Sequence, residues 1–113
     1  MRLERMWLEG ADASHAVRVL ATPWERMRGL LGRGQNALPV VLEPCASVHT
    51  LGMHHALDLA FLAEDGTVVA AERDVPPGKL RSCRGASAVL ERPASNEVWP
   101  RAGERVRRQP LGR

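Results

Sequence analysis

The residues best suited to chemistry in this chain lie between Cys45 and Phe61, in the stretch CASVHTLGMHHALDLAF. This stretch contains one of the two cysteines and three of the four histidines. In an extended strand, alternate side chains point to the same side. The alternation therefore predicts one chemically rich face, which consists of Cys45, Ser47, His49, Leu51 and Met53.

A thiol-dependent enzyme is one interpretation of this stretch. Cys45 could be the nucleophile of an acyl transfer, with His49 or His55 as its base. Asp58 could then orient the imidazole. In a fully extended strand, however, the Cα atoms of Cys45 and His49 would be about 13 Å apart. The enzyme interpretation therefore requires a bend in the chain or the use of a different histidine.

A metal-binding module is a second interpretation. Thiolate, thioether and imidazole groups are soft ligands that suit Cu(I) or zinc. The spacing C-x3-H-x4-HH is not a standard zinc signature, and Cys83 has no second cysteine near it. The candidate metal ligands are Cys45, His49, His54 and His55.

The interpretation that we favour is a small non-enzymatic binding or accessory domain. A free cysteine is most often a small buried apolar residue, and a lone histidine or aspartate is most often a hydrogen-bonded structural residue. We expect one pocket for an unidentified small ligand or protein partner, without a cofactor. The residues expected to border it are Cys45, His49, Met53 and Asp58.

Length and charge limit the remaining possibilities. A chain of 113 residues with 44% hydrophobic residues suits one core, so we expect a single compact domain over residues 1–106. Residues 98–113 carry five arginines against Glu104, whereas residues 1–97 carry a net charge of −1. We therefore assign the positive charge to an arginine-rich end that frays over residues 107–113, and we expect no specific nucleic-acid binding.

No apolar run approaches the roughly 20 residues that span a bilayer. The first residues, MRLERMWLEGADAS, lack the apolar core of a signal peptide. We therefore expect a monomeric cytoplasmic protein without a membrane span, in which both cysteines are reduced thiols.

The clearest local signal predicts a helix over residues 23–32. Thr22 is a good N-cap, Pro23 fits the first helical position, and Glu25 completes a capping box. Glycines at 32 and 34 would stop the helix. The helical spacing predicts one packing face, which consists of Trp24, Met27, Leu30 and Leu31.

Short strands account for most of the rest. Asp65-Gly66 predicts a hairpin between strands at 57–63 and 67–73. Pro44 indicates that the strand at 40–43 is an edge strand or is followed by a bend, and residues 79–85 are expected to be a polar loop. Further strands are expected at 3–9, 15–20, 47–50, 86–92 and 103–106, with 97–99 as a strand or a packed loop. These elements predict an α+β, mainly β fold: a small antiparallel barrel-like or two-sheet domain with one short helix near the N-terminus.

Five segments in this order resemble one known family, the uncharacterised bacterial and archaeal proteins called domain of unknown function 192. The segments are TPWERMRGLLGR, CASVHTLGM, ALDLAFLAEDGTVV, ASAVLE and GERV. The resemblance covers about residues 15–106. It implies a compact, mainly β domain with a short helix near the N-terminus and no established activity.

The same resemblance implies that the family's recurrent positions correspond to Gly29, Leu30, Met53 and Asp58. This chain departs from the family pattern at two places. It has His-His-Ala at 54–56 where relatives usually have a basic residue and a proline, and Pro-Ala-Ser-Asn at 93–96 where relatives tend to have a glycine. The first departure leaves the charge of the site open.

Overall fold

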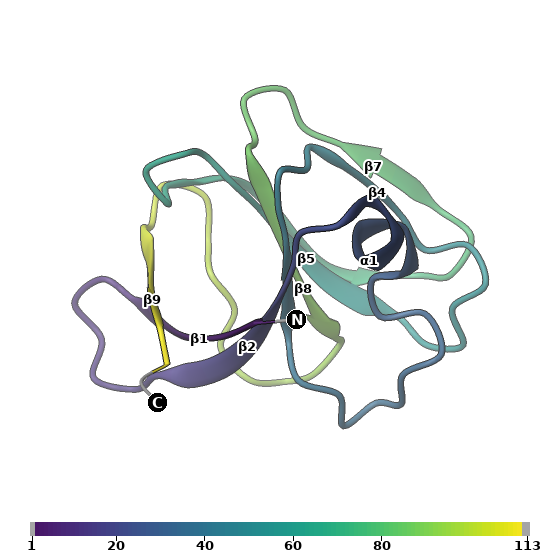
Figure 1. Ribbon diagram of the computed structural model, residues 1–113, viewed down its shortest axis with the longest axis horizontal. Coiled ribbons are helices and arrows are strands. Elements are labelled where there is room, and N and C mark those ends of the chain that lie inside the picture. The colour runs from purple at the N-terminus through teal and green to yellow at the C-terminus, as the bar shows by residue number, and fades with distance from the viewer. Residues whose placement is uncertain (1, 112–113) are drawn as a thin grey trace.

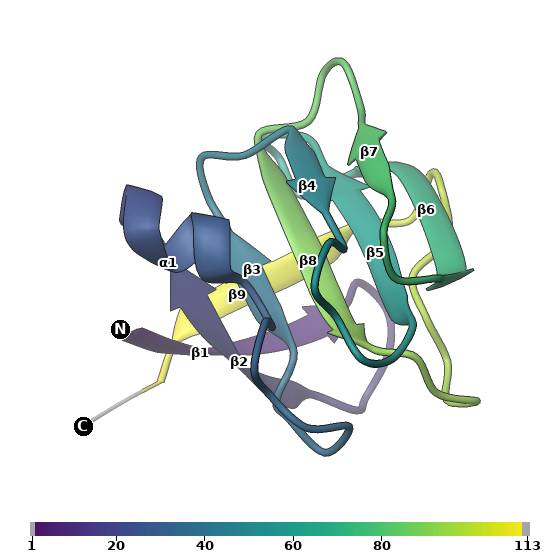
Figure 2. The same ribbon diagram turned by 90° about the vertical axis from the view of Figure 1, so that its right-hand side faces the viewer.

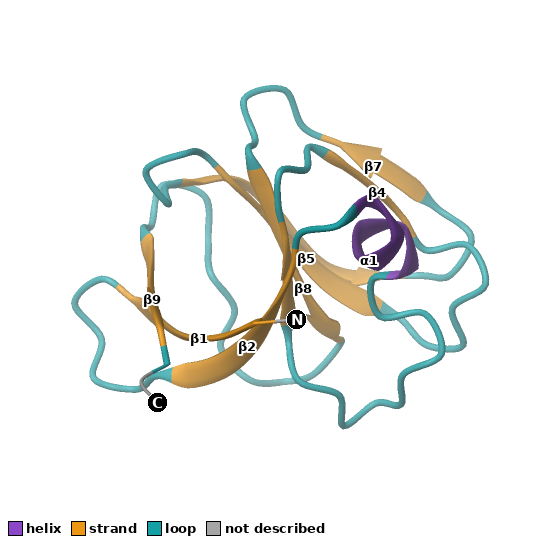
Figure 3. Cartoon of the chain, viewed as in Figure 1, coloured by secondary structure: helices purple, strands orange, loops and turns teal. Residues whose placement is uncertain are grey.

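A seven-stranded sheet with the strand order β6-β5-β8-β3-β2-β1-β9 forms the main part of the computed structural model, which describes residues 2–111 (Figure 1). Its strands are β1 (Arg2–Leu8), β2 (His15–Leu20), β3 (Val40–Leu42), β5 (Leu57–Leu62), β6 (Val68–Val75), β8 (Ala88–Pro93) and β9 (Val106–Pro110). A second sheet pairs β4 (Ser47–His49) with β7 (Leu80–Ser82), and helix α1 spans Pro23–Arg28. The predicted mainly β fold with one short helix near the N-terminus is confirmed. The large sheet curls into a half-barrel (Figure 3).

The large sheet separates two apolar clusters. The β4–β7 sheet and α1 lie over one face, and the turn after α1 packs against that face through Leu30 (Figure 2). The cluster on this covered face consists of Leu20, Leu30, Val40, Leu42, Val48, Met53, Leu57, Leu59, Phe61, Val75 and Val89. The other face curls around a second cluster, which consists of Met6, Val17, Val41, Ala60, Leu62, Val68, Ala88, Leu90, Trp99 and Val106. Strands such as β5 are apolar on both faces because both faces are buried.

The predicted hairpin around Asp65-Gly66 is confirmed. Strands β5 and β6 are antiparallel, and the Asp65 carboxylate accepts a hydrogen bond from the backbone N–H of Thr67 at 2.9 Å. The ladder contains register shifts, so residues 57–62 and 68–75 do not pair one to one throughout. The predicted strand–turn–strand at the N-terminus also forms, as β1 and β2.

Of the two alternatives for residues 40–43, the structure shows the bend: the chain bends at Glu43 and Pro44, directly after β3. Strand β3 lies between β2 and β8 rather than at an edge, and it pairs parallel with β2. The connection between them passes through α1, and a parallel pair requires a crossover of this kind. Residues 80–82 of the expected polar loop form β7, because β4 offers them a partner that local sequence does not reveal.

Helix α1 has the predicted start but ends early. Thr22 and Glu25 form the complete capping box, whereas the helix stops at Arg28 with Gly29 as its C-cap. The expected packing role of Trp24 and Met27 is wrong, since these side chains are 66% and 59% exposed. The chain turns after Arg28, so Leu30 enters the core from the turn rather than from a helical face. Within residues 2–111, no helix has the length and apolar character needed to cross a membrane.

The arginine-rich end is not frayed where the structure describes it. Residues 106–110 form β9, which pairs antiparallel with β1, while residues 112–113 lie outside the described part. The arginines of this end form ion pairs with acidic residues of distant segments. These pairs are Arg105–Glu9, Arg105–Asp65, Arg107–Glu9, Arg108–Glu4 and Arg108–Glu43. Three arginines of this end are therefore paired with acidic residues, whereas Arg101 has no ion pair among the described residues.

We predict that Gly66→Ala destabilises the fold far more than Gly103→Ala. Both glycines have positive φ, +89° and +92°, so both substitutions incur backbone strain. A Cβ on Gly66 would lie 2.3 Å from the backbone oxygen of Val106, whereas a Cβ on Gly103 meets nothing within 4 Å. Urea unfolding should show losses of about 3 kcal/mol or more for Gly66→Ala and about 1 kcal/mol for Gly103→Ala. Equal losses would contradict the close approach at Gly66.

Candidate functional site

The inside of the half-barrel opens at two ends. Strands β5 and β8 are antiparallel, with Leu62 opposite Ala88 at one end and Asp58 opposite Arg92 at the other. A cavity of about 530 Å³ lies at the Leu62 end, and a cavity of about 1190 Å³ lies at the Arg92 end. The two ends differ in chemistry, so each is considered separately.

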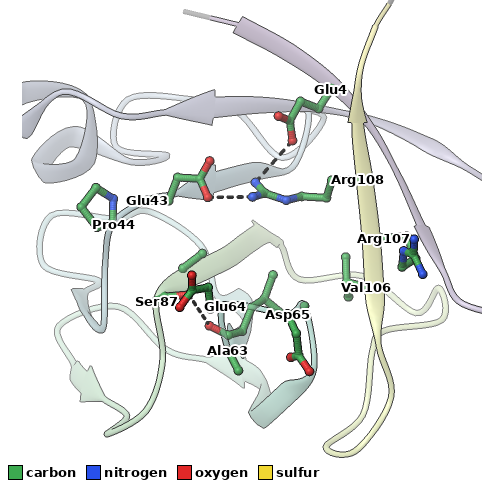
Figure 4. A pocket seen from close by; sticks show the side chains of 13 residues that line it. Glu4, Glu43, Pro44, Ala63, Glu64, Asp65, Ser87, Val106, Arg107 and Arg108 are labelled. Carbon is green, nitrogen blue, oxygen red and sulfur yellow. Dashed lines mark hydrogen bonds and ion pairs between the residues drawn. The ribbon is translucent and has the colours of Figure 1, made fainter.

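The smaller cavity is polar and lies beside a network of ion pairs (Figure 4). Arg108 lies between two carboxylates, with its Nη2 atom 2.7 Å from Glu43 and its Nη1 atom 3.4 Å from Glu4. Arg2 contacts the same two carboxylates at 2.8 and 3.4 Å. Two arginines therefore neutralise two glutamates, and the network joins β9 to β1 and to the end of β3. We interpret this network mainly as a structural link between these strands.

The larger cavity is mostly apolar. Its apolar walls come from strands β1, β2, β8 and β9 and from three loops: the one between β1 and β2, the one before β3 and the one after β8. They consist of Met6, Trp7, Leu8, Ala11, Ala13, Ala16, Ala37, Leu38, Pro39, Pro93, Val98, Trp99, Pro100 and Val106. The polar lining residues are Ser14, His15, Gln35, Asn36, Arg92, Ser95, Asn96 and Glu97. A concave apolar site with a few polar groups is the usual form of a small-molecule pocket.

Asp58 fixes the wall of the larger cavity through hydrogen bonds to the residues that form or adjoin that wall. The side chain is 1% exposed and accepts hydrogen bonds from Arg92 Nε at 2.9 Å and from the backbone N–H groups of Asp74 and Ser95. Arg92 in turn donates to the carbonyls of Val98 and Glu97, and its guanidinium lies 4.5 Å from the ring centre of Trp99. Asp58 therefore positions cavity residues without lining the cavity itself.

The structure places Cys45 and Met53 on the covered face of the sheet. Met53 is buried in the cluster of that face, and Cys45 packs against the same cluster. Asp58 belongs to the opposite face, because it alternates along β5 with Leu57 and Leu59. Neither of the two cavities is lined by Cys45, His49, Met53 or Asp58. Cys45 and Met53 are brought together, and Asp58 is separated from them by the sheet.

The thiol and imidazole groups do not form a reactive pair in this structure. The Cys45 thiol donates to the carbonyl of Ser47 at 3.1 Å, and His49 Nδ1 accepts from the backbone N–H of Leu51. Burial raises the pKa of the Cys45 thiol, and the nearby Glu91 carboxylate raises it further, although the Ser47 hydrogen bond opposes them. A raised pKa means less thiolate at neutral pH and a weaker nucleophile.

The candidate metal ligands are also dispersed. The ring nitrogens of His55 lie 3.2 Å from the carbonyl oxygens of Ala56 and Arg33, and His54 is exposed. Across residues 2–111, no three His, Cys, Asp or Glu side chains are grouped as a metal site would require.

Glu91 is the unusual residue that the sequence-based site omitted. It is 3% exposed and faces the covered cluster, because it alternates along β8 with Leu90 and Arg92. Its carboxylate has no hydrogen bond or ion pair among the described residues, and burial raises its pKa to about 7. A Cβ added to Gly29 would lie 3.2 Å from Glu91 Oε1, so the backbone after α1 closes over the carboxyl group. Side chains alternate along a strand, so Val89 and Glu91 lie on the same face of β8. This alternation is the signal in the sequence that indicates a buried Glu91.

Taken together, the chain is a small, mainly β domain with a curled half-barrel and an apolar cavity at one end, and residues 2–111 contain no cluster of possible metal ligands. The sequence matches a family model over residues 6–98, which is most of its length. The protein belongs to the DUF192 family, whose members are described as "Uncharacterized ACR". The resemblance noted from the sequence is therefore confirmed.

Solved structures with the same fold include two bacterial proteins. One, from Sinorhizobium meliloti 1021, is described as a "putative transcription regulator"; it has a TM-score of 0.77 and 22% sequence identity, with 93% of this chain and 92% of that chain covered. The other is a protein of unknown function from Novosphingobium aromaticivorans DSM 12444, with a TM-score of 0.75, 18% identity and coverage of 93% and 84%. At these identities the similarity shows the fold alone. Comparison with curated proteins gives no match.

We predict that Glu91 makes the fold less stable as the pH rises toward neutrality. Between the ordinary carboxyl pKa of 4.5 in the unfolded chain and about 7 in the folded chain, the folded chain binds more protons. The free energy of unfolding should therefore fall across this window and level off above it. Glu91→Gln should remove that fall and raise stability at pH 8 by roughly 2–3 kcal/mol.

Urea unfolding at pH 5 and at pH 8 measures this effect. Glu64→Gln is the matched control, because Glu64 is exposed and has no ion pair among the described residues. The interpretation fails if Glu91→Gln keeps the pH dependence of the unchanged protein.

We also predict that Cys45 reacts slowly with thiol reagents at neutral pH. In a Cys83→Ser background, the rate of alkylation by iodoacetamide should rise only above the ordinary pKa range of a cysteine thiol, because burial disfavours the thiolate. His49→Ala should leave this profile unchanged. Fast alkylation near pH 7 that slows in His49→Ala or His55→Ala would instead support the thiol-dependent enzyme.

Proposed function

We propose that this protein is a non-enzymatic binding domain that takes a small, uncharged and largely apolar molecule into the larger cavity. The observation that carries this proposal is the cavity of about 1190 Å³ at the Arg92 end of the half-barrel. Pockets for drug-sized ligands measure roughly 300–1000 Å³ and are mainly apolar and aromatic, with a few polar groups that orient the ligand. The cavity has enough room and the right kind of lining for such a ligand.

The walls of the cavity contain apolar side chains whose burial by a ligand would be favourable. Trp7 and Trp99 both line it, and Val98 and Leu38 are exposed there despite their apolar side chains. Covering apolar surface of this kind contributes about 25 cal/mol per Å². A ligand with an aromatic or branched aliphatic body would therefore gain most of its affinity from these walls.

The charges around the cavity favour an uncharged ligand. The charged or titratable lining residues are His15, Arg92 and Glu97. Arg92 is already neutralised by Asp58, and its remaining donors contact the carbonyls of Val98 and Glu97. A ligand carboxylate would have to displace these partners, so the guanidinium serves to shape the cavity rather than to bind an anion.

This proposal keeps the expected class of function and moves the site. Asp58 contributes by bracing Arg92 and Trp99, whereas Cys45 and Met53 pack in the core of the other face. The thiol-dependent enzyme has less support, because the Cys45 thiol donates to a backbone carbonyl and not to a histidine. A binding domain needs none of these groups to react.

We predict that Leu38→Lys weakens binding of the neutral fluorescent probe N-phenyl-1-naphthylamine. An ammonium group in the apolar wall should lower affinity about tenfold, since it replaces an apolar contact worth about 1.5 kcal/mol. Leu3→Lys is the matched control, because Leu3 is 41% exposed against 44% for Leu38 and does not line the cavity. Fluorescence titration gives both dissociation constants. Equal affinities in the two variants, or no saturable binding to the unchanged protein, would exclude the cavity as the binding site.

A further inference from the structure

The layer that covers the large sheet carries most of the uncompensated positive charge. It consists of α1 and the turn after it (residues 22–34), β4 with its flanks (44–56) and β7 with its flanks (76–87), and we call it the outer layer (Figure 2). These segments contain six of the sixteen basic residues and one of the thirteen acidic ones. The rest of the chain therefore has ten basic and twelve acidic residues and a net negative charge.

The basic side chains of the outer layer are mostly left without acidic partners. Arg28, Arg33, Lys79 and Arg84 are exposed, and none of them has an ion pair among the described residues. Burial lowers the pKa of Arg18, and the positive charges of Arg33 and Arg28 lower it further. Like charges are therefore concentrated beside α1, in contrast to the paired arginines of β9.

The same layer carries most of the prominent exposed apolar side chains. Five large apolar residues are more than half exposed, and four of them belong to the outer layer: Trp24, Met27, Leu51 and Leu80. Two contacts connect these positions. Leu31, four residues after Met27 in the chain, lies against Gly52, which follows Leu51. Leu80 pairs in the β4–β7 ladder with His49, whose ring accepts from the N–H of Leu51.

We propose that the outer layer is a docking surface for an anionic membrane surface. Basic residues near an anionic bilayer attract it, and apolar side chains beside them enter the headgroup region. Trp24 is of the residue type that favours this interface. Exposed apolar side chains ringed by polar residues mark interaction sites in general.

The shape of the layer favours lipid over a peptide. None of the four exposed apolar residues lines either cavity, so they project rather than form a groove. A bilayer accepts projecting side chains without a complementary shape, whereas a bound peptide needs a groove with pockets. The proposal is independent of the apolar cavity, which lies on the other face of the large sheet.

Vesicle co-sedimentation of the full chain tests this proposal directly. The protein should bind phosphatidylcholine vesicles that contain phosphatidylserine and should not bind vesicles of phosphatidylcholine alone. Binding should weaken as salt is added, because salt screens exposed charges. Tryptophan fluorescence should shift to the blue on binding, and Trp24→Phe should abolish that shift.

Two matched pairs of variants locate the surface. Arg28→Glu should lower partition onto anionic vesicles about fivefold for each unit of charge lost. Arg5→Glu is the control and should not lower it, because Arg5 is an exposed arginine of β1 without an ion pair among the described residues. Leu80→Ser should lower partition about tenfold, whereas Val98→Ser, at an even more exposed position by the cavity, should not.

Several results would overturn the proposal. These are equal binding to neutral and anionic vesicles, equal effects of Arg28→Glu and Arg5→Glu, or no binding to either vesicle at low salt. Salt-dependent binding to duplex or single-stranded nucleic acid that is lost in Arg28→Glu, without any vesicle binding, would assign the surface to nucleic acid instead. If the protein bound anionic vesicles but not N-phenyl-1-naphthylamine, the result would contradict only the proposed ligand site in the cavity.

Discussion

The buried ion pair between Asp58 and Arg92 is the interaction on which the shape of the half-barrel's open end depends. Asp58 lies on β5 and accepts three hydrogen bonds, from β8, from β6 and from the loop after β8. Arg92 also donates hydrogen bonds to two carbonyls of that loop, and its guanidinium lies over the ring of Trp99. Trp99 then donates its indole N–H to the carbonyl of Leu59. The loop after β8, whose residues 95–100 belong to no strand, is thereby fixed as one wall of the apolar cavity.

A buried charge pair of this kind is costly to desolvate, and apolar replacements are often equally stable. Its value therefore lies less in stability than in the geometry that it imposes. Asp58 and Arg92 each have several partners with fixed directions, so the loop can take few other positions. The network at the other end joins strands to each other through the ion pairs of Arg108 with Glu4 and Glu43. Charged residues inside the half-barrel thus position a loop at one end and link strands at the other.

Local signals in the sequence predicted the elements better than their partners. The Asp65-Gly66 hairpin and the Thr22 capping box depend on neighbouring residues, and both are present in the structure. The parallel pairing of β2 with β3, the strand at 80–82 and the exposure of Trp24 depend on segments far away in the chain. The same limit applies to the site: alternation placed Cys45 and Met53 together, but only the sheet topology shows that Asp58 faces the other way. Charge counted by sequence position does not show the ion pairs that Arg107 and Arg108 form with acidic residues far away in the chain.

Charged side chains on the two sides of the large sheet differ in whether they have partners of opposite sign. Inside the half-barrel, Asp58, Arg92 and the glutamates near Arg108 all have partners of opposite sign. In the outer layer, four basic side chains have no ion pair in the described part of the chain, and Trp24 and Leu80 are exposed beside them. Unpaired like charges lower stability and exposed apolar surface lowers solubility, and neither follows from the needs of the fold. Residues that oppose stability or solubility in this way are expected at functional surfaces. The outer layer is the part of the molecule where such a departure is largest, and this is why we assign an interaction to it rather than to the well-paired end of the chain.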